Sequence, residues 1–190
     1  MAKDVAGKPE TGARERILEA AYTVAERSGA AALTLDAVAA EAKVSKGGLL
    51  YHFPSKEALV AGMVDGLCRT CRDLAATAAQ ADPEPLGRSA RAYLAACAGD
   101  LWHSSRWTAL VGALVVNPEL LDAWRVDVLA GRVADEEEGV DPTAAEIVRL
   151  AADGMWVGEI LGLPGPGREL RAKVLAELNQ MTRDRRPAGP

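Results

Sequence analysis

The chain has 190 residues, enough for one domain or two small ones, and 49% of them are hydrophobic, which excludes an intrinsically disordered protein. Its net charge is -5, but residues 1–60 carry eight Lys or Arg and eight Asp or Glu, so the acidity lies in the remaining 130 residues. No stretch of 18 apolar residues occurs and the first ten residues are polar, which predicts no membrane helix, no signal peptide and a cytoplasmic protein.

Composition and pattern both predict an all-α protein. Ala and Leu are abundant, aromatic residues make up only 4%, and no strand-like alternation stands out. Residues 1–11 are expected to form a flexible N-terminal arm and residues 183–190 a flexible tail. Cys68, Cys71 and Cys97 are an odd number at spacings that suit no disulfide framework, which is typical of a reducing compartment.

The first predicted helix covers residues 12–28 and ends at Gly29. A helix-turn-helix is predicted next, at about residues 33–52, with Thr34 and Ser45 as N-caps and Pro54 where the second helix must end. The connection between its two helices is only Lys43 and Val44. Such a tight pair buries little apolar surface alone, so it normally rests on a third helix and places its second helix in a DNA major groove.

The charge around this motif favours DNA. Between residues 42 and 56 the chain carries Lys43, Lys46 and Lys56 and no acidic residue, with Tyr51 and His52 as neutral hydrogen-bonding groups between them. This pattern predicts a phosphate-facing patch on an otherwise acidic protein. The alternative is that two amphipathic helices of an all-α core carry a few solvated lysines.

Residues 14–63 closely resemble the N-terminal domain of the tetracycline-repressor (TetR/AcrR) regulators. The residues that carry the resemblance are Ile17-Leu18, Ala20-Ala21, Gly29, Thr34, Val38-Ala39, Val44-Ser45-Lys46-Gly47, Leu49, Tyr51-His52-Phe53 and Lys56-Glu57-Ala58-Leu59. The resemblance implies that residues 45–52 form a recognition helix and that Thr34, Tyr51, His52 and Lys56 hold phosphates.

Three positions depart from the family pattern. Lys43 replaces the usual Gly of the turn, so a residue with a Cβ is expected to adopt a left-handed conformation at some cost. Leu50 replaces a frequent Tyr, which removes a possible DNA contact. Ala25 replaces a frequent Phe, which predicts a thinner core beneath the first helix.

We predict DNA contacts from one set of residues around the motif. Lys46 and the Gly47-Gly48 pair are expected to face base edges, because Lys46 is the only long donor at the start of the helix and the glycines allow a close approach. The full predicted set is Thr34, Lys43, Ser45, Lys46, Gly47, Gly48, Tyr51, His52 and Lys56. The predicted DNA-binding domain covers residues 12–60, and a C-terminal helical ligand-binding and dimerisation domain covers residues 61–182.

The remaining chain also reads as helical. Ser55 is predicted to cap a long helix that reaches about Thr77. Further helices are expected at residues 85–103, 106–116, 118–136, 142–161 and 167–182, separated by Pro, Gly and capping residues.

Three patterns suggest chemistry that we do not expect. Cys68 and Cys71 form C-x-x-C, but no second pair and no nearby His accompany them, so neither a metal site nor a redox site is predicted. The acidic run at residues 135–138 is more simply a solvated turn. His103 precedes two serines, but no glycine-framed serine is present, so neither catalysis nor a cofactor is predicted.

The four tryptophans all follow residue 100, and each lies on a different predicted helix. They are Trp102, Trp107, Trp124 and Trp156. They could be core residues, or they could line a pocket for an apolar or aromatic small molecule. The family resemblance favours the pocket, since such regulators usually carry an effector pocket in the C-terminal domain.

The last two predicted helices carry small and apolar residues along one side, which predicts an interface. The residues are Ala151, Gly154, Gly158, Leu161, Leu170, Val174 and Leu178. The alternative is ordinary packing within the chain. The family resemblance implies instead that these helices pair with their copies in a four-helix dimer interface.

These observations predict a homodimeric, ligand-responsive DNA-binding transcriptional regulator without enzymatic activity. The expected mechanism is that of a repressor released from a palindromic operator when a small apolar or aromatic effector changes the spacing of the two recognition helices. The alternative is a helical dimeric protein-interaction module that retains the helix-turn-helix only as scaffold; the three lysines of residues 42–56 argue against it.

Overall fold

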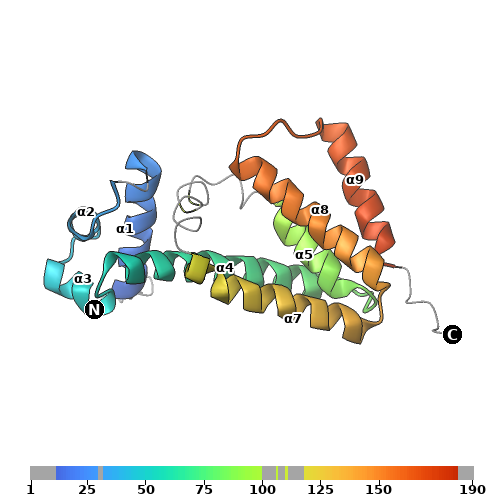
Figure 1. The fold of residues 1–190 in the computed structure, drawn as a ribbon, viewed down its shortest axis with the longest axis horizontal. Coiled ribbons are helices and arrows are strands. Elements are labelled where there is room, and N and C mark those ends of the chain that lie inside the picture. Colours follow the sequence, from blue (N-terminus) through green and yellow to red (C-terminus); the bar gives the residue numbers. More distant parts are fainter. Residues whose placement is uncertain (1–11, 30–31, 100–105, 107–109, 111–117, 184–190) are drawn as a thin grey trace, which may run out of the picture. The chain divides into compact units, whose positions relative to one another are not determined.

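The computed structural model describes residues 12–29, 32–99, 106, 110 and 118–183. Every regular element in these ranges is a helix, so the all-α prediction is confirmed (Figure 1). The chain divides into two compact units, residues 1–64 and residues 65–190, called here the N-terminal and the C-terminal unit. Long helix α4 (Lys56–Ala81) contributes to both units, and the predicted domain boundary after residue 60 falls within it.

The N-terminal unit contains α1 (Ala13–Ser28), α2 (Leu35–Glu41), α3 (Lys46–His52) and the first turns of α4. Helix α1 packs on α2 and α3, and its apolar side, which includes Ile17, Ala21 and Val24, is buried. The Tyr22 hydroxyl donates a hydrogen bond to the carbonyl oxygen of Met63 at 2.5 Å, which ties α1 to α4. Ile17, Leu49 and Leu59 are fully buried at the centre of this small core.

Side-chain caps begin the helices of the motif where the sequence predicts them. The Thr34 hydroxyl accepts from the Ala37 amide at 3.2 Å, the Ser45 hydroxyl accepts from the Gly48 amide at 3.0 Å, and Ser55 caps α4 in the same way at 3.1 Å. Lys43, between α2 and α3, has a φ of 54°, so its predicted left-handed conformation is confirmed.

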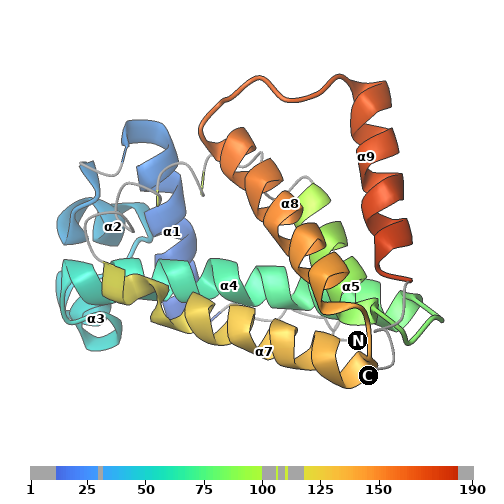
Figure 2. The ribbon, with the colours of Figure 1, turned by 45° about the vertical axis from the view of Figure 1, so that its right-hand side comes forward.

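The C-terminal unit contains the rest of α4 with α5 (Arg88–Ala98), a 3-10 turn η3 (Pro118–Leu121), α7 (Asp122–Glu138), α8 (Pro142–Ile160) and α9 (Arg168–Met181). Helix α5 packs against α7 and α8, and α9 packs against α8. Figure 2 shows α5, α7 and α8 gathered beside the second half of α4. Among the described residues, no helix has both the length and the apolar character needed to cross a bilayer.

Some helix boundaries differ from the predicted ones. Helix α4 runs to Ala81 instead of ending near Thr77, because its Ala-rich last turns remain helical. Helix α5 begins at Arg88 instead of residue 85, since Pro83 and Pro85 lie in an irregular segment and Gly87 takes a left-handed φ of 68° just before the helix. Residues 118–121 form a 3-10 turn ahead of α7, which continues to residue 138. The predicted helix at residues 106–116 lies almost entirely outside the described residues.

A buried arginine joins the ends of three helices in the C-terminal unit. Arg91 of α5 pairs with Asp82, just after α4, at 2.6 Å. It also donates to the Leu86 and Glu84 carbonyl oxygens, both at 2.7 Å, and to the Thr182 hydroxyl at 3.1 Å. Because the guanidinium is satisfied on several sides, its burial fixes these chain segments together instead of destabilising them.

Candidate DNA-binding surface and ligand groove

Helix α3 is held from one side and exposed on the other. Leu49 is fully buried and Phe53, at the end of the helix, is 3% exposed, so these two side chains anchor α3 in the N-terminal unit. On the other side Ser45 to Gly48 and Leu50 are exposed, and Tyr51 is 86% exposed. A large aromatic side chain so far out of the core is available to an external partner.

Lys46 lies on this exposed surface, but it has an ionic partner that the sequence analysis did not identify. Its ammonium nitrogen is 2.8 Å from Oδ1 of Asp36, in the first turn of α2. Both side chains are more than half exposed, so solvent and salt screen the pair and it contributes little to stability. A nucleic acid could therefore replace Asp36 as the partner of Lys46 at small cost.

The other predicted DNA-binding residues lie on the same unit. Lys43 and Lys56 are exposed, and His52 is half-buried with its ring edge-to-face on Tyr51 at 5.1 Å. The Thr34 and Ser45 hydroxyl oxygens already accept cap hydrogen bonds, but each hydroxyl hydrogen remains able to donate to a phosphate. A Cβ at Gly47 would meet nothing within 4 Å, so packing within the described chain does not require a glycine there.

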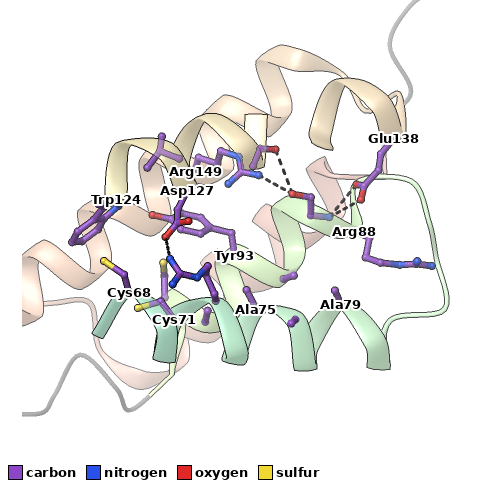
Figure 3. A pocket seen from close by; sticks show the side chains of 18 residues that line it. Cys68, Cys71, Ala75, Ala79, Arg88, Tyr93, Trp124, Asp127, Glu138 and Arg149 are labelled. Atoms are coloured by element: carbon purple, nitrogen blue, oxygen red, sulfur yellow. Dashed lines mark hydrogen bonds and ion pairs between the residues drawn. The ribbon is translucent and has the colours of Figure 1, made fainter. Parts of the chain in front are cut away.

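A groove of about 310 Å³ lies within the C-terminal unit (Figure 3). Its walls come from α4, α5 and α7, with one residue from α8. The lining residues are Cys68, Cys71, Arg72, Ala75, Ala76 and Ala79 from α4; Arg88, Ser89, Ala92, Tyr93, Ala96 and Cys97 from α5; Trp124, Asp127, Val128, Gly131 and Glu138 from α7; and Arg149 from α8. Most of these side chains are small and apolar, so the groove has the character of a small-molecule site.

Most of the charged groups beside the groove have partners within the protein. Arg72 pairs with Asp127 at 2.6 Å. Arg149 and Asp135 form a buried pair at 2.6 Å, and a second nitrogen of Arg149 donates to the Ser89 hydroxyl at 3.0 Å. The guanidinium of Arg149 also lies 5.1 Å from the centre of the Tyr93 ring. These interactions fix the wall that α5, α7 and α8 form.

All three cysteines of the chain line the groove. Burial raises the pKa of the Cys68 thiol to about 11 and those of Cys71 and Cys97 to about 12. The thiols are therefore protonated near neutral pH and behave as small apolar side chains. No cluster of potential metal ligands occurs within the described ranges.

The predicted tryptophan cluster is only partly visible. Trp124 lines the groove, and the ring of Trp156 packs on the ring of Trp124, with their centres 4.9 Å apart. Trp156 itself does not line the groove, and its ring nitrogen donates to Asp153 at 3.2 Å. Trp102 and Trp107 lie outside the described residues. Five alanines and three cysteines make up eight of the 18 residues that line the described groove, and no ligand contact was predicted for any of them.

The predicted interface residues lie on α8 and α9, apart from Leu161, which directly follows α8, and most are accessible. Leu161 is 59% exposed, Leu170 56% and Val174 37%, while Ala151 is half-buried. A Cβ at Gly154 or Gly158 would meet nothing within 4 Å. Leu178 differs: it is 6% exposed, because it packs within its own unit, so it cannot contribute to an exposed face.

Both halves of the chain match known sequence families. Residues 17–63 match the bacterial regulatory proteins of the tetR family, and residues 87–183 match the tetracyclin repressor-like C-terminal domain. No curated protein matches the chain.

Solved structures with the same fold cover nearly the whole chain. The multidrug binding protein EbrR complexed with malachite green is 26% identical, with a TM-score of 0.62 over 90% of this chain and 98% of that one. EbrR complexed with ethidium has a TM-score of 0.60, over 90% of this chain and 99% of that one, at 26% identity. A TetR-family member from Streptomyces coelicolor A3 is 27% identical, with a TM-score of 0.65 over 90% of this chain and 98% of that one. With both halves matched, the chain belongs to the TetR family of DNA-binding transcriptional regulators and is not an enzyme.

Proposed function

We propose that this regulator is a homodimeric repressor that binds a palindromic operator and leaves it when a small apolar effector occupies the groove. The observation that carries the DNA-binding part is the exposed face of α3, from Ser45 to Tyr51, which has no acidic residue of its own and meets one carboxylate, that of Asp36 in α2, through an exposed pair with Lys46. In the proposed assembly residues 12–60 contact DNA, and residues 61–182 bind the effector and the second copy.

Lys46 with Gly47 and Gly48 would approach base edges, while Thr34, Tyr51, His52 and Lys56 would hold phosphates. Binding to an operator selected from a random DNA pool by the wild-type protein tests these roles. Lys46→Ala should change sequence preference, whereas Lys56→Ala should weaken binding to all sequences and reduce the salt dependence by about one ion.

Arg132→Ala is the matched control for these substitutions, because it removes one exposed cation from the C-terminal unit. It should leave the salt dependence unchanged. If Lys46→Ala and Lys56→Ala behave like this control, α3 is not the recognition helix. If the random pool yields no preferred sequence at all, the protein-interaction alternative becomes the better explanation.

The exposed apolar residues of α8, α9 and the adjoining Leu161 would form the dimer interface. Leu150 and Leu170 are 60% and 56% exposed, and the open glycines of α8 would allow a second helix to approach closely. A two-fold contact of this kind would pair two recognition helices for the two halves of a palindrome.

Gly158→Arg should give a monomer that binds DNA weakly, and analytical ultracentrifugation at micromolar concentration measures this directly. Ala130→Arg, at an exposed position of α7, is the control and should remain dimeric. A wild-type protein that sediments as a monomer would rule out the proposed interface.

The groove would connect effector binding to DNA binding through α4. The turns of α4 that hold Leu59 and Met63 belong to the core of the N-terminal unit, and the turns from Cys68 to Ala79 form a wall of the groove. An effector would release DNA only if it binds the released conformation more tightly than the DNA-bound one.

Malachite green, which EbrR binds, is a suitable first probe of this effector role; ethidium, which EbrR also binds, is not, because it intercalates into DNA itself. A ligand that displaces the operator should change the tryptophan fluorescence, and Trp124→Phe should reduce that change. Displacement with no fluorescence change in either protein would place the effector elsewhere.

A further inference from the structure

The lining of the groove extends along several turns of α4. Its α4 wall is a single stripe of one or two residues per turn, from Cys68 to Ala79, which corresponds to about 16 Å along the helix. Helix α7 extends along this stripe in the same chain direction as α4, and α5 extends along it in the opposite direction. Asp127 meets Arg72 near one end, and Glu138 meets Ser89 near the other. Figure 3 shows Trp124 and Cys68 at one end and Arg88 and Glu138 at the opposite end.

The polar side chains in the middle of the groove, Tyr93 and Arg149, already have partners in Asp153 and Asp135, so the remaining wall offers a ligand almost no polar partner. This wall consists of Ala75, Ala92, Ala96 and the thiol of Cys97, which is buried and protonated. Such walls give dispersion contacts and apolar burial, and they hold no ionic group for a second anchor. A ligand that fills this part must therefore be apolar along most of its length.

One end of the groove holds an unsatisfied donor. Among the described residues, the Arg88 Nε is buried and has no hydrogen-bond partner, and it is the only such side-chain atom of the described groove lining. Arg72 and Arg149, the other guanidiniums of the lining, are paired with carboxylates. The buried Nε is out of a ligand's reach, but among the described residues the Arg88 guanidinium forms no ion pair, so a ligand anion at this end would supply the missing partner.

We propose that the effector is an unbranched aliphatic carboxylate of about 12 carbon atoms, the length that spans the groove. Its carboxylate would accept hydrogen bonds from Arg88, and its chain would run between α4, α5 and α7 toward Trp124. This inference rests on the proposed effector role of the groove. Glu138 is the competing anion at the Arg88 end; it accepts from the Ser89 amide, and burial raises the pKa of its carboxyl group.

Binding of alkanoates of increasing length to the full chain, followed by tryptophan fluorescence below their micelle concentrations, tests the proposal. Affinity should rise about fourfold per added methylene and then stop rising near 12 carbons, where the groove is full. Alkylamines and alkanols of the same lengths are the comparison series, and both should bind more weakly than the carboxylates.

Two variants test the carboxylate anchor. Arg88→Gln should weaken alkanoate binding about tenfold or more and leave alkanol binding nearly unchanged. Glu138→Gln keeps an acceptor for the Ser89 amide and removes the competing charge, so it should strengthen alkanoate binding. Circular dichroism of each variant checks that the helices are retained.

The outcomes separate this inference from the proposed function. Affinity that does not depend on chain length, or alkylamines that bind better than alkanoates, would overturn the inference. If malachite green displaces DNA and alkanoates do not bind, the effector role stands and the carboxylate inference fails. If alkanoates bind with the expected length dependence but never displace DNA, the ligand class stands and the effector role of the groove fails.

Discussion

Replacing Lys43 with Gly should stabilise the N-terminal unit. With a φ of 54°, Lys43 is the one described non-glycine residue in the left-handed region. For an L-residue this conformation costs about 1–2 kcal/mol, because Cβ approaches the following carbonyl oxygen. Glycine avoids that cost but loses about 0.5–1 kcal/mol more backbone entropy on folding. The free energy of unfolding should therefore rise by about 0.5–1 kcal/mol in Lys43→Gly.

Urea unfolding followed by two signals assigns the effect to its unit. All four tryptophans follow residue 100, so their fluorescence reports on the C-terminal unit, while circular dichroism reports on helices of both units. The circular dichroism transition should move to higher urea and the fluorescence transition should not. Lys43→Ala is the matched control, since it removes the same charge but keeps Cβ in the left-handed conformation.

The two variants also separate strain from charge in DNA binding. Each removes one cation, so each should lower the salt dependence of DNA binding by about 0.9 of an ion if Lys43 contacts a phosphate. Only Lys43→Gly should gain stability. Equal stability of the glycine and alanine variants, or a less stable glycine variant, would refute the strain argument.

Three further predictions concern the C-terminal unit. Gly87→Ala should lower the free energy of unfolding in urea by at least about 2 kcal/mol, because the new Cβ would collide with the backbone carbonyl of Thr182, just after α9. Gly139 is also left-handed but lies in open space, so Gly139→Ala should lower it by only about 1–2 kcal/mol. Arg149→Met should cost about 3–5 kcal/mol because it leaves Asp135 buried and unpaired, and adding Asp135→Leu should recover most of that loss. The Cys97 thiol, with a pKa of about 12, should react with iodoacetamide at pH 8 about a thousandfold more slowly than in unfolded protein. The free energy of unfolding should fall as pH rises above about 9, because the thiol ionises first in the unfolded protein.

The helix-turn-helix could be predicted closely because its signals are local. Thr34, Ser45 and Ser55 each stand one residue before a helix, and a cap hydrogen bond reaches only three residues along the chain. The left-handed Lys43 was predicted from the family resemblance, because it stands where the family usually has Gly in the turn. The ion pair between Lys46 and Asp36 could not be predicted, because it depends on how α2 and α3 cross, and no local sequence pattern determines that angle.

The groove could not be located from the sequence because small residues make it. Large flat side chains suggested a pocket around the tryptophans, yet eight of the 18 lining residues are alanines or cysteines, whose short side chains leave space between packed helices. The same small residues at helical spacing are equally consistent with close packing, and only the positions of three helices decide between the two. Leu178 illustrates the converse: it shares the stripe of Leu170 and Val174 in sequence but is buried.

The size of the groove also limits how an effector could act on DNA. Burial of a chain of about 12 carbons would contribute on the order of 8–10 kcal/mol before entropic costs. A shift of the two conformations from 1:99 to 99:1 requires about 5.5 kcal/mol of difference in binding free energy between them. More than half of the burial of the ligand's alkyl chain would therefore have to be lost in the DNA-bound conformation. In the proposed mechanism a change at one end of the groove would not suffice, and α4 would have to close against α5 or α7 over several turns, which the small side chains of the lining permit.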